Sequence, residues 1–182
     1  YSSKIEGENI ELDSFIKHKK FGAKYLPDYT RKIDDLYDAY LFAQHTKLSA
    51  KSVVRAHEQL TKHILHKSHR GKYRTTNMFV ITKDGKIEYA AVAPVKVKSE
   101  MNKLFSDVKT LLQSELSFEE VLFFASMLHL VFVKIHPFED GNGRIGRLLI
   151  EKVLSQSLGQ SVLIAVSKVL EKSKNEYYAE LE

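Results

Sequence analysis

The sequence predicts a mainly α-helical fold, a bundle of helices that carries one β-hairpin. Apolar residues recur at the three- and four-residue spacing of helices over most of the chain. A single stretch alternates as paired strands do, and one long run is apolar on nearly every side. No repeat or linker-like tract divides the 182 residues, a length within the range of one domain.

The predicted helices before the strands follow this periodicity. One covers residues 31–43, where Ile33, Leu36 and Tyr40 share a face, and the next runs from about residue 49 to 65. The strand pair spans Asn77–Pro94 around Asp84-Gly85, a favoured tight-turn pair. Because a lone hairpin is only marginally stable, we expect it to pack on the helices or to act as a mobile element.

Two further helices are predicted after the strands, over about 98–112 and 118–135. Ser117 and Glu120 form a capping-box pattern that marks the start of the second one. Since residues 118–135 are apolar almost all round, this helix is expected to be the buried centre of the fold.

The composition indicates an ordinary globular protein, with 43% hydrophobic and 28% charged residues. Lys and Arg outnumber Asp and Glu by 28 to 23, and outside residues 62–74 the basic residues are spread out, so nucleic-acid binding is not favoured. The absence of cysteine suits a reducing compartment, and a cytoplasmic location is expected. The most apolar run, 121–135, is too short to cross a bilayer, so no membrane partner is expected.

The segment HPFEDGNGRIGR, residues 136–147, concentrates residue types suited to phosphate chemistry. Pro137 ends the preceding helix and leaves His136 at its C-terminal end. Gly141, Asn142 and Gly143 accept left-handed backbone angles, so the loop can aim consecutive N–H groups at one point. A helix predicted over 144–155 would add free N–H donors and the positive end of its dipole.

The charged side chains of this segment point to a nucleotide. Arg144 and Arg147 lie three residues apart and can clamp a polyphosphate. Glu139 or Asp140 can hold the Mg²⁺ that accompanies polyphosphate, and His136 is the natural general base beside it. The alternative is a plain helix N-terminus with solvated arginines and a histidine bonded to a carbonyl.

These residues resemble a known family. HPFEDGNGRIGR matches all nine specified positions of the Fic-family signature, HPFx[D/E]GNGRxxR. The GKYR segment before the strands and the Tyr177-Tyr178 pair also resemble a Fic core, here placed at 49–182 behind an N-terminal helical segment, 1–48. Val92-Ala93-Pro94 departs from the two prolines that many relatives carry. The resemblance implies a Fic-type helical bundle with a hairpin flap, and transfer of AMP from ATP to a protein hydroxyl (AMPylation).

The resemblance also implies a role for each matching residue. His136 would deprotonate the target hydroxyl, and Asp140 would bind Mg²⁺. Phe138 would anchor the loop in the core. The predicted nucleotide-binding residues are Gly141, Asn142, Gly143, Arg144, Arg147, Tyr177 and Tyr178, the two tyrosines near the adenine. The hairpin Asn77–Pro94 would hold a segment of the target protein by strand addition, and self-modification and homo-oligomer formation stay open.

The first residues, SSKIEGEN, allow two interpretations. Ser2 and Glu6 lie one helical turn apart before Gly7, as in any frayed terminal helix. They also resemble the family's inhibitory [S/T]xxxE[G/N] helix, at about residues 2–7, whose glutamate pairs with the second motif arginine, here Arg147. Three other functions stay open: removal of AMP with Glu6 orienting a water, transfer from another nucleotide donor, and a non-catalytic nucleotide switch, which the intact His136 disfavours.

The remaining histidines are not expected to bind metal. His63, His66 and His69 recur every third residue among basic side chains without a carboxylate, which favours a solvated face over a metal site. His57 and His129 lie on apolar faces and are expected to be packing residues.

Overall fold

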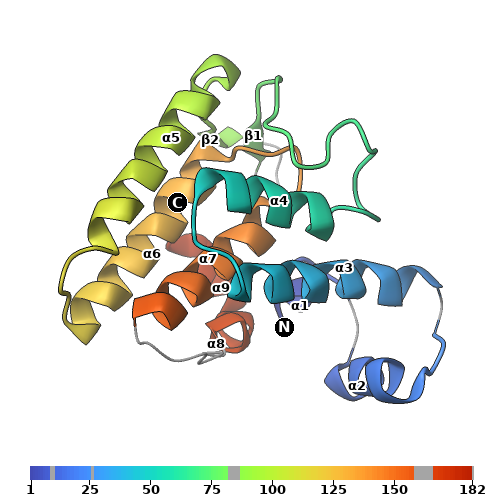
Figure 1. The fold of residues 1–182 in the computed structure, drawn as a ribbon. Helices are drawn as coiled ribbons and strands as arrows, with labels where there is room; N and C mark the ends of the chain where they lie inside the picture. Colours follow the sequence, from blue (N-terminus) through green and yellow to red (C-terminus); the bar gives the residue numbers. More distant parts are fainter. Residues whose placement is uncertain (9–10, 26, 82–86, 158–165, 182) are drawn as a thin grey trace.

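The computed structural model describes residues 1–8, 11–25, 27–81, 87–157 and 166–181. The described part is mainly helical with one strand pair, as the sequence predicts (Figure 1). In chain order its elements are α1 (Ser2–Ile5), α2 (Leu12–Phe21), α3 (Pro27–Gln44), α4 (Ala50–Leu60), β1 (Phe79–Ile81), β2 (Ile87–Ala90), α5 (Pro94–Leu111), α6 (Phe118–Ile135), α7 (Asn142–Ser157), α8 (Val166–Lys172) and α9 (Lys174–Ala179).

Helices α6 and α7 form the centre of the molecule, with α5 beside α6 and the α3–α4 pair across α7 (Figure 1). Leu60, Met101, Phe132, Ile145 and Leu149, from four different helices, are completely buried where these helices meet. Burying a side chain of this size contributes about 1.5–3 kcal/mol. The loop between α6 and α7 is therefore held between two well-packed helices.

The predicted bounds of two helices, α6 and α4, can be compared with those of the structure. Helix α6 has the predicted bounds, and the predicted capping box is present: Ser117 Oγ accepts from the Glu120 N–H, and a Glu120 carboxylate oxygen accepts from the Ser117 N–H. The prediction that the second helix reaches residue 65 is wrong, because α4 ends at Leu60. The N–H of His63 donates to the Asp35 carboxylate at 2.9 Å, so it does not continue the helical ladder.

The prediction that α6 is buried all round is correct for one face only. Its inner face packs into the core through residues such as Leu128, Phe132 and Ile135. Its outer face exposes Phe123 and Val131, at 60% and 38% of their surfaces. An apolar composition shows that a helix has no strongly polar side, but it does not show how many neighbours cover it.

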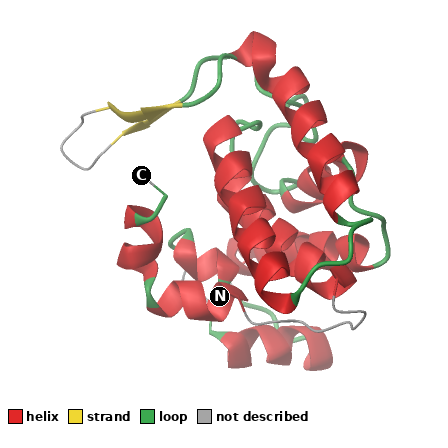
Figure 2. Ribbon diagram, turned by 90° about the vertical axis from the view of Figure 1, so that its left-hand side faces the viewer, coloured by secondary structure: helices red, strands yellow, loops and turns green. Residues whose placement is uncertain are grey.

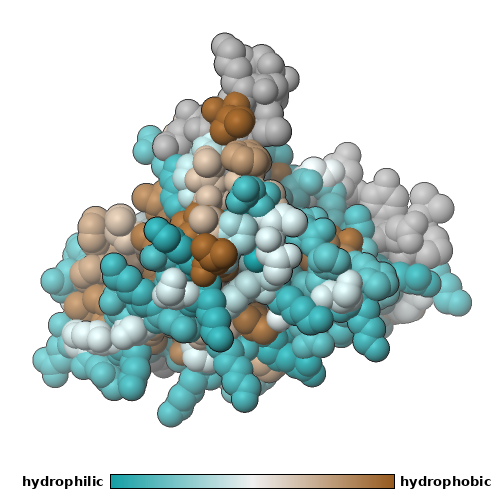
Figure 3. All heavy atoms as spheres, turned by 90° about the horizontal axis from the view of Figure 1, so that it is seen from above, coloured by the Kyte–Doolittle hydropathy of each residue, from teal (hydrophilic) through white to brown (hydrophobic). Residues whose placement is uncertain are grey.

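The hairpin projects from the helical body (Figure 2). Strands β1 and β2 pair antiparallel, with Phe79 opposite Ala90 and a register shift after Val80. The Asp84-Gly85 turn lies outside the described residues. Phe79 and Ile87 are 47% and 63% exposed, and apolar atoms gather beside the hairpin on the face seen in Figure 3. The described strands are thus presented outward.

The N-terminal segment adds two short helices and the longer α3. Helix α1 packs against α7 and α8 and buries Ile5, whereas α2 has no buried residue. Helix α3 contributes Ala39 and Ala43 to the same core as the later helices, and a domain boundary near residue 49 stays a prediction. No helix in the described ranges is long and apolar enough to cross a membrane.

Candidate active site

The loop between α6 and α7 begins with a sharp break in the backbone. His136 caps α6 in the left-handed conformation, with φ 50° and ψ 60°, and is the one non-glycine residue with positive φ in the described part of the chain. Pro137 follows it, as predicted for the end of the helix. Phe138 is fully buried, and its ring stacks on His57 with centroids 3.7 Å apart. Phe138 is therefore packed in the core, as the predicted anchor of the loop would be.

Polar side chains hold the rest of the loop in shape. Asn142 Oδ1 accepts from the Phe138 N–H at 3.0 Å, and Asn142 Nδ2 donates to the Phe138 carbonyl at 2.8 Å. Gly141 has φ 83°, and a Cβ there would lie 2.9 Å from Leu60 Cδ2, so only glycine fits. Because the Asn142 side chain is used within the loop, a ligand can meet only backbone groups at this position.

His57 of α4 is hydrogen-bonded to the backbone of the loop. The Gly71 N–H donates to His57 Nδ1 at 3.0 Å, which leaves the proton on Nε2, and Nε2 donates to the Asp140 carbonyl at 2.9 Å. Burial lowers the pKa of His57 to about 4 and keeps the ring neutral. The sequence indicated only a packing residue here, because the partner carbonyl lies 83 residues away.

His136 has the geometry of a general base. Its Nδ1 lies 3.3 Å from the Val133 carbonyl oxygen, which can only accept, so the proton sits on Nδ1 and Nε2 is free to accept one. Burial first, and the positive charge of Arg74 next, lower the pKa of His136 below its ordinary value. The ring is therefore neutral and able to act as a base near pH 7.

The two carboxylates of the loop have different surroundings. Asp140 Oδ1 accepts from the Gly141 N–H and from Arg144 Nη2, the latter at 3.1 Å. Glu139 is paired with His69, away from the arginines. The expectation that Asp140 rather than Glu139 acts in the site stays a prediction.

The donor set at Asp140 fits Mg²⁺. Its side chain is half exposed, and one oxygen is oriented by the loop while the other has no assigned partner in the described residues. No cluster of three His, Asp or Glu side chains occurs there in the described chain. A single carboxylate suits Mg²⁺, which takes most of its ligands from phosphate oxygens and water.

Arg147 is fully buried and is held by the N-terminal segment. Its Nη2 donates to Glu6 Oε1 at 2.5 Å and to the Ser2 carbonyl at 3.1 Å, and its Nε donates to Ser2 Oγ at 3.0 Å. The predicted pairing of Glu6 with Arg147 is present. The sequence did not predict that Ser2 binds the same guanidinium group twice.

The Glu6 carboxylate lies at the start of α7. A Cβ on Gly143 would meet Glu6 Oε1 at 2.7 Å and Arg147 Nη1 at 3.1 Å. A second acidic residue, Glu8, lies 3.5 Å from Arg144 Nη1. The helix N-terminus and both arginines, the groups suited to phosphate, are therefore met by carboxylates of this same chain.

Of the predicted tyrosine pair, Tyr177 reaches the site. Its hydroxyl lies 2.9 Å from His129 Nε2 and accepts from Arg147 Nη1 at 3.5 Å, while Tyr178 stays 42% exposed. Burial lowers the pKa of His129 to about 4, as expected of a packing histidine. A role of either tyrosine beside an adenine stays a prediction.

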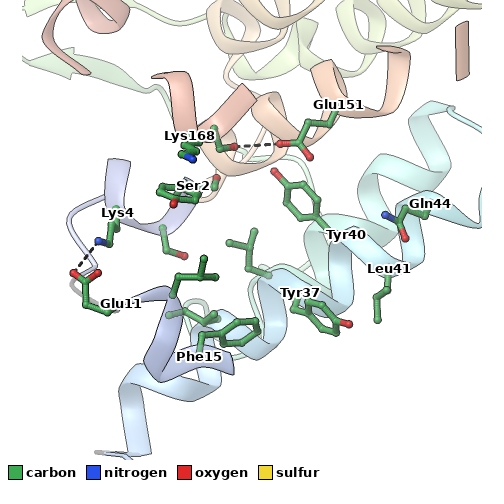
Figure 4. Close-up of a pocket in the computed structure, with 16 residues that line it drawn as sticks. Ser2, Lys4, Glu11, Phe15, Tyr37, Tyr40, Leu41, Gln44, Glu151 and Lys168 are labelled. Atoms are coloured by element: carbon green, nitrogen blue, oxygen red, sulfur yellow. Dashed lines mark hydrogen bonds and ion pairs between the residues drawn. The ribbon is translucent and has the colours of Figure 1, made fainter. Parts of the chain in front are cut away.

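Helix α1 also borders a cavity of about 460 Å³, which does not include the loop residues (Figure 4). Side chains of α1, α2 and α3 line it, with Glu151 of α7 and Lys168 of α8 at one end. Burial raises the pKa of Glu151 to about 7, and Ser167 Oγ donates to its carboxylate. The N-terminal segment thus contacts Arg147 on one side and borders this cavity on the other.

Known proteins resemble this chain in sequence. The chain is 30% identical over 124 residues to "Protein adenylyltransferase Fic" of Nematostella vectensis, covering 68% of this chain and 27% of that protein. It is 26% identical over 141 residues to "Protein adenylyltransferase fic-1" of Caenorhabditis elegans, covering 78% and 25%. The chain thus spans about a quarter of the length of these relatives.

The fold is also found in solved structures. A Fic family protein from Desulfovibrio desulfuricans G20 superposes with a TM-score of 0.83 at 23% identity, over 99% of this chain and 53% of that one. Fic-1 from C. elegans gives a TM-score of 0.75 at 19% identity, over 100% and 52%. The sequence profile of the Fic/DOC family matches residues 47–154, which is more than half of the chain and includes the whole loop. This chain belongs to the Fic/DOC family.

Proposed function

We propose that this chain is a protein adenylyltransferase, which transfers AMP from ATP to a Ser, Thr or Tyr hydroxyl of a target protein, and that Glu6 inhibits it. The proposal is carried by two observations: His136 Nε2 has no hydrogen-bond partner among the described residues, and the two arginines that follow it in the motif are paired with carboxylates. The names of the curated relatives support the same activity.

The proposed reaction needs one proton acceptor and a bound pyrophosphate. The target oxygen forms a bond to the α-phosphorus, the bond between the α-phosphorus and the bridging oxygen breaks, and pyrophosphate leaves. The hydroxyl proton passes to His136 Nε2. Arg144, Arg147 and the N–H groups at the start of α7 would hold the phosphates in line. Asp140 would hold Mg²⁺, which neutralises phosphate charge when bound.

Inhibition follows from the position of Glu6. Its carboxylate occupies the space over Gly143 and takes a guanidinium nitrogen of Arg147. A phosphate that needs the same arginine would have to displace it. ATP would then bind without its full set of contacts, and the wild-type chain would transfer AMP poorly.

The same carboxylate supports a second candidate, removal of AMP from a modified protein. Glu6 Oε1 lies next to Gly143 at the start of α7, so it could orient a water toward the phosphorus in the reverse direction. Transfer from a different nucleotide is a further alternative, because the loop would contact phosphates and not the base.

One experiment separates these candidates. Wild type and Glu6→Gly are incubated with Mg²⁺ and each labelled nucleotide, and separately with protein that already carries labelled AMP. Glu11→Gly is the matched control, since Glu11 lies in the same N-terminal segment, is exposed, and is paired only with Lys4 among the described residues. We expect labelled AMP from ATP to be attached to protein by Glu6→Gly, and not by wild type or Glu11→Gly. Loss of preformed label in wild type but not Glu6→Gly would indicate removal, and no labelling with any nucleotide would overturn the proposal.

A further inference from the structure

Arg74 is a buried cation whose side chain bonds to carbonyl oxygens and to no other group among the described residues. Its side chain is 5% exposed, and no carboxylate lies within ion-pair distance of it in the described part of the chain. Its guanidinium group donates to the carbonyls of Ile135 (3.2 Å), His136 (2.6 Å), Thr76 (2.7 Å) and Val92. A buried charge with this many fixed bonds is expected to define the geometry around it.

The four carbonyls belong to two different parts of the fold. Thr76 precedes β1 and Val92 follows β2, so both ends of the hairpin are bound. The other two carbonyls are at the C-terminal end of α6, where unpaired carbonyls and the helix dipole favour a cation. Arg74 therefore joins the base of the hairpin to the end of the helix that carries His136.

The backbone at His136 needs such support. A left-handed conformation is unfavourable for a residue with a Cβ and persists only where its surroundings enforce it. Arg74 Nε donates to the His136 carbonyl, and the Arg74 N–H donates to the Pro137 carbonyl at 2.9 Å. Both peptide groups that follow the strained residue are thus fixed by one residue.

We infer that Arg74 is a positioning residue: it holds the hairpin and His136 at a fixed separation, so that a hydroxyl on a segment aligned along the hairpin meets Nε2. This inference rests on the proposed function. Tyr89 of β2 assists by donating its hydroxyl to the Lys134 carbonyl in the last turn of α6. Misplacement of a reacting group by about 1 Å can lower a rate by about 10²-fold, so the effect on transfer should be large.

The positive charge of Arg74 has a second consequence for His136. It is one of the causes that lower the pKa of the imidazole. Replacing Arg74 by a neutral residue should raise that pKa, whereas lysine should keep the charge and lose the fork of bonds. The two variants therefore separate the charge of Arg74 from its geometry.

The test compares Arg74→Met, Arg74→Lys and the control Arg70→Gln. Arg70 is in the same segment, but its Nε donates to the Leu65 carbonyl, away from His136. In nucleotide-free protein we would follow the His136 imidazole by NMR titration and exchange of the Ala91 N–H, which donates to the Met78 carbonyl across the hairpin. We expect faster exchange in both Arg74 variants, a raised His136 pKa in Arg74→Met alone, and no change in Arg70→Gln.

Activity is measured in the Glu6→Gly background. We expect kcat to fall about 10- to 100-fold in both Arg74 variants with little change in KM for ATP. Unchanged kcat with unchanged Ala91 exchange would overturn the inference. If Glu6→Gly transfers no AMP at all, the proposed function fails, and the titration and exchange still decide the role of Arg74. If Arg74→Met does not fold, Arg74→Lys decides it by exchange and kcat.

Discussion

The Glu6 carboxylate lies 2.5 Å from a guanidinium nitrogen of Arg147, a residue 141 positions later in the chain. Arg147 is completely buried, and Ser2 holds the same guanidinium group through its hydroxyl and its carbonyl. The contact therefore connects the first turn of the chain to the arginine that we propose binds the end of a polyphosphate. Whether Arg147 is available to another ligand therefore depends on whether the segment that contains α1 stays packed against it.

Glu6→Gly should raise self-AMPylation on the order of tens-fold over wild type. Arg147 is buried and Glu6 is partly exposed, so removing Glu6 should cost at most the about 3–5 kcal/mol that is usual when the other charge of a buried pair is stranded. Arg147 is not stranded if it can turn to a phosphate, so this energy can favour productive ATP binding. A shift from 1:99 to 99:1 needs about 5.5 kcal/mol, much of which one such pair can supply. Labelled ATP measures the effect, and Arg147→Ala in the Glu6→Gly background should erase it.

His136→Ala in the Glu6→Gly background should abolish transfer and leave ATP binding largely intact. Among the described residues the imidazole bonds to the Val133 carbonyl and to neither motif arginine, and loss of a general base lowers rates by about 10²–10⁴-fold. Labelling assays measure the loss of transfer, and calorimetric titration with ATP measures whether binding is retained. Transfer at the parent rate would show that another group accepts the proton.

The pH profile of transfer should reflect the lowered pKa of His136. The protonated imidazole cannot act as a base, so activity is lost as pH falls through the pKa and is constant above it. Because burial and Arg74 place that pKa below its ordinary value of about 6.5, Glu6→Gly should keep full activity at pH 7. Rates measured from pH 5 to 8 test this, and a decline that begins above pH 7 would contradict it.

Asp140→Ala should lower Mg²⁺-dependent activity far more than Glu139→Ala. Asp140 is oriented by Arg144 and the Gly141 N–H, whereas Glu139 is paired with His69. The Mg²⁺ concentration for half-maximal labelling, measured in the Glu6→Gly background, should rise only for Asp140→Ala. Equal losses in both variants, or activity that persists with a chelator, would argue against Asp140 as the metal-binding residue.

The sequence predicted those parts of the site that lie within one short segment. His136, Asp140 and the two arginines are close together because a helix end, a loop and a helix start are consecutive, and helical spacing predicts that geometry. The pairing of Glu6 with Arg147 was predicted only through the resemblance to a family, since no periodicity relates residues so far apart. Local patterns likewise predicted the capping box of α6 and its bounds.

Contacts between distant segments were not predictable. Arg74 has the sequence appearance of one more residue in a basic stretch, yet it binds carbonyls up to 62 positions away. His57 shows the same limit, because its partners are the backbone groups of Gly71 and Asp140. Ser2 shows it too, because it binds the side chain of Arg147, 145 positions later. Arg74 belongs to the GKYR segment that resembles a Fic core, but nothing in the sequence shows that its side chain is buried or which carbonyls it binds.

The two buried neutral histidines should make the protein less stable in mild acid. Burial lowers the pKa of His57 and of His129 to about 4, below the value of about 6.5 in an unfolded chain. Between these pH values the unfolded chain binds protons that the folded chain does not, so stability is full above about pH 6.5 and is lost as pH falls toward about 4. Each histidine can contribute up to about 1.4 kcal/mol per pH unit to this loss.

Urea unfolding at pH 7, 6 and 5 measures the free energy of unfolding. His57→Gln should be less stable than wild type at pH 7, because it loses the bonds to Gly71 and Asp140, but the difference should shrink toward pH 5. Parallel curves for the two proteins would show that His57 is not held neutral in the fold.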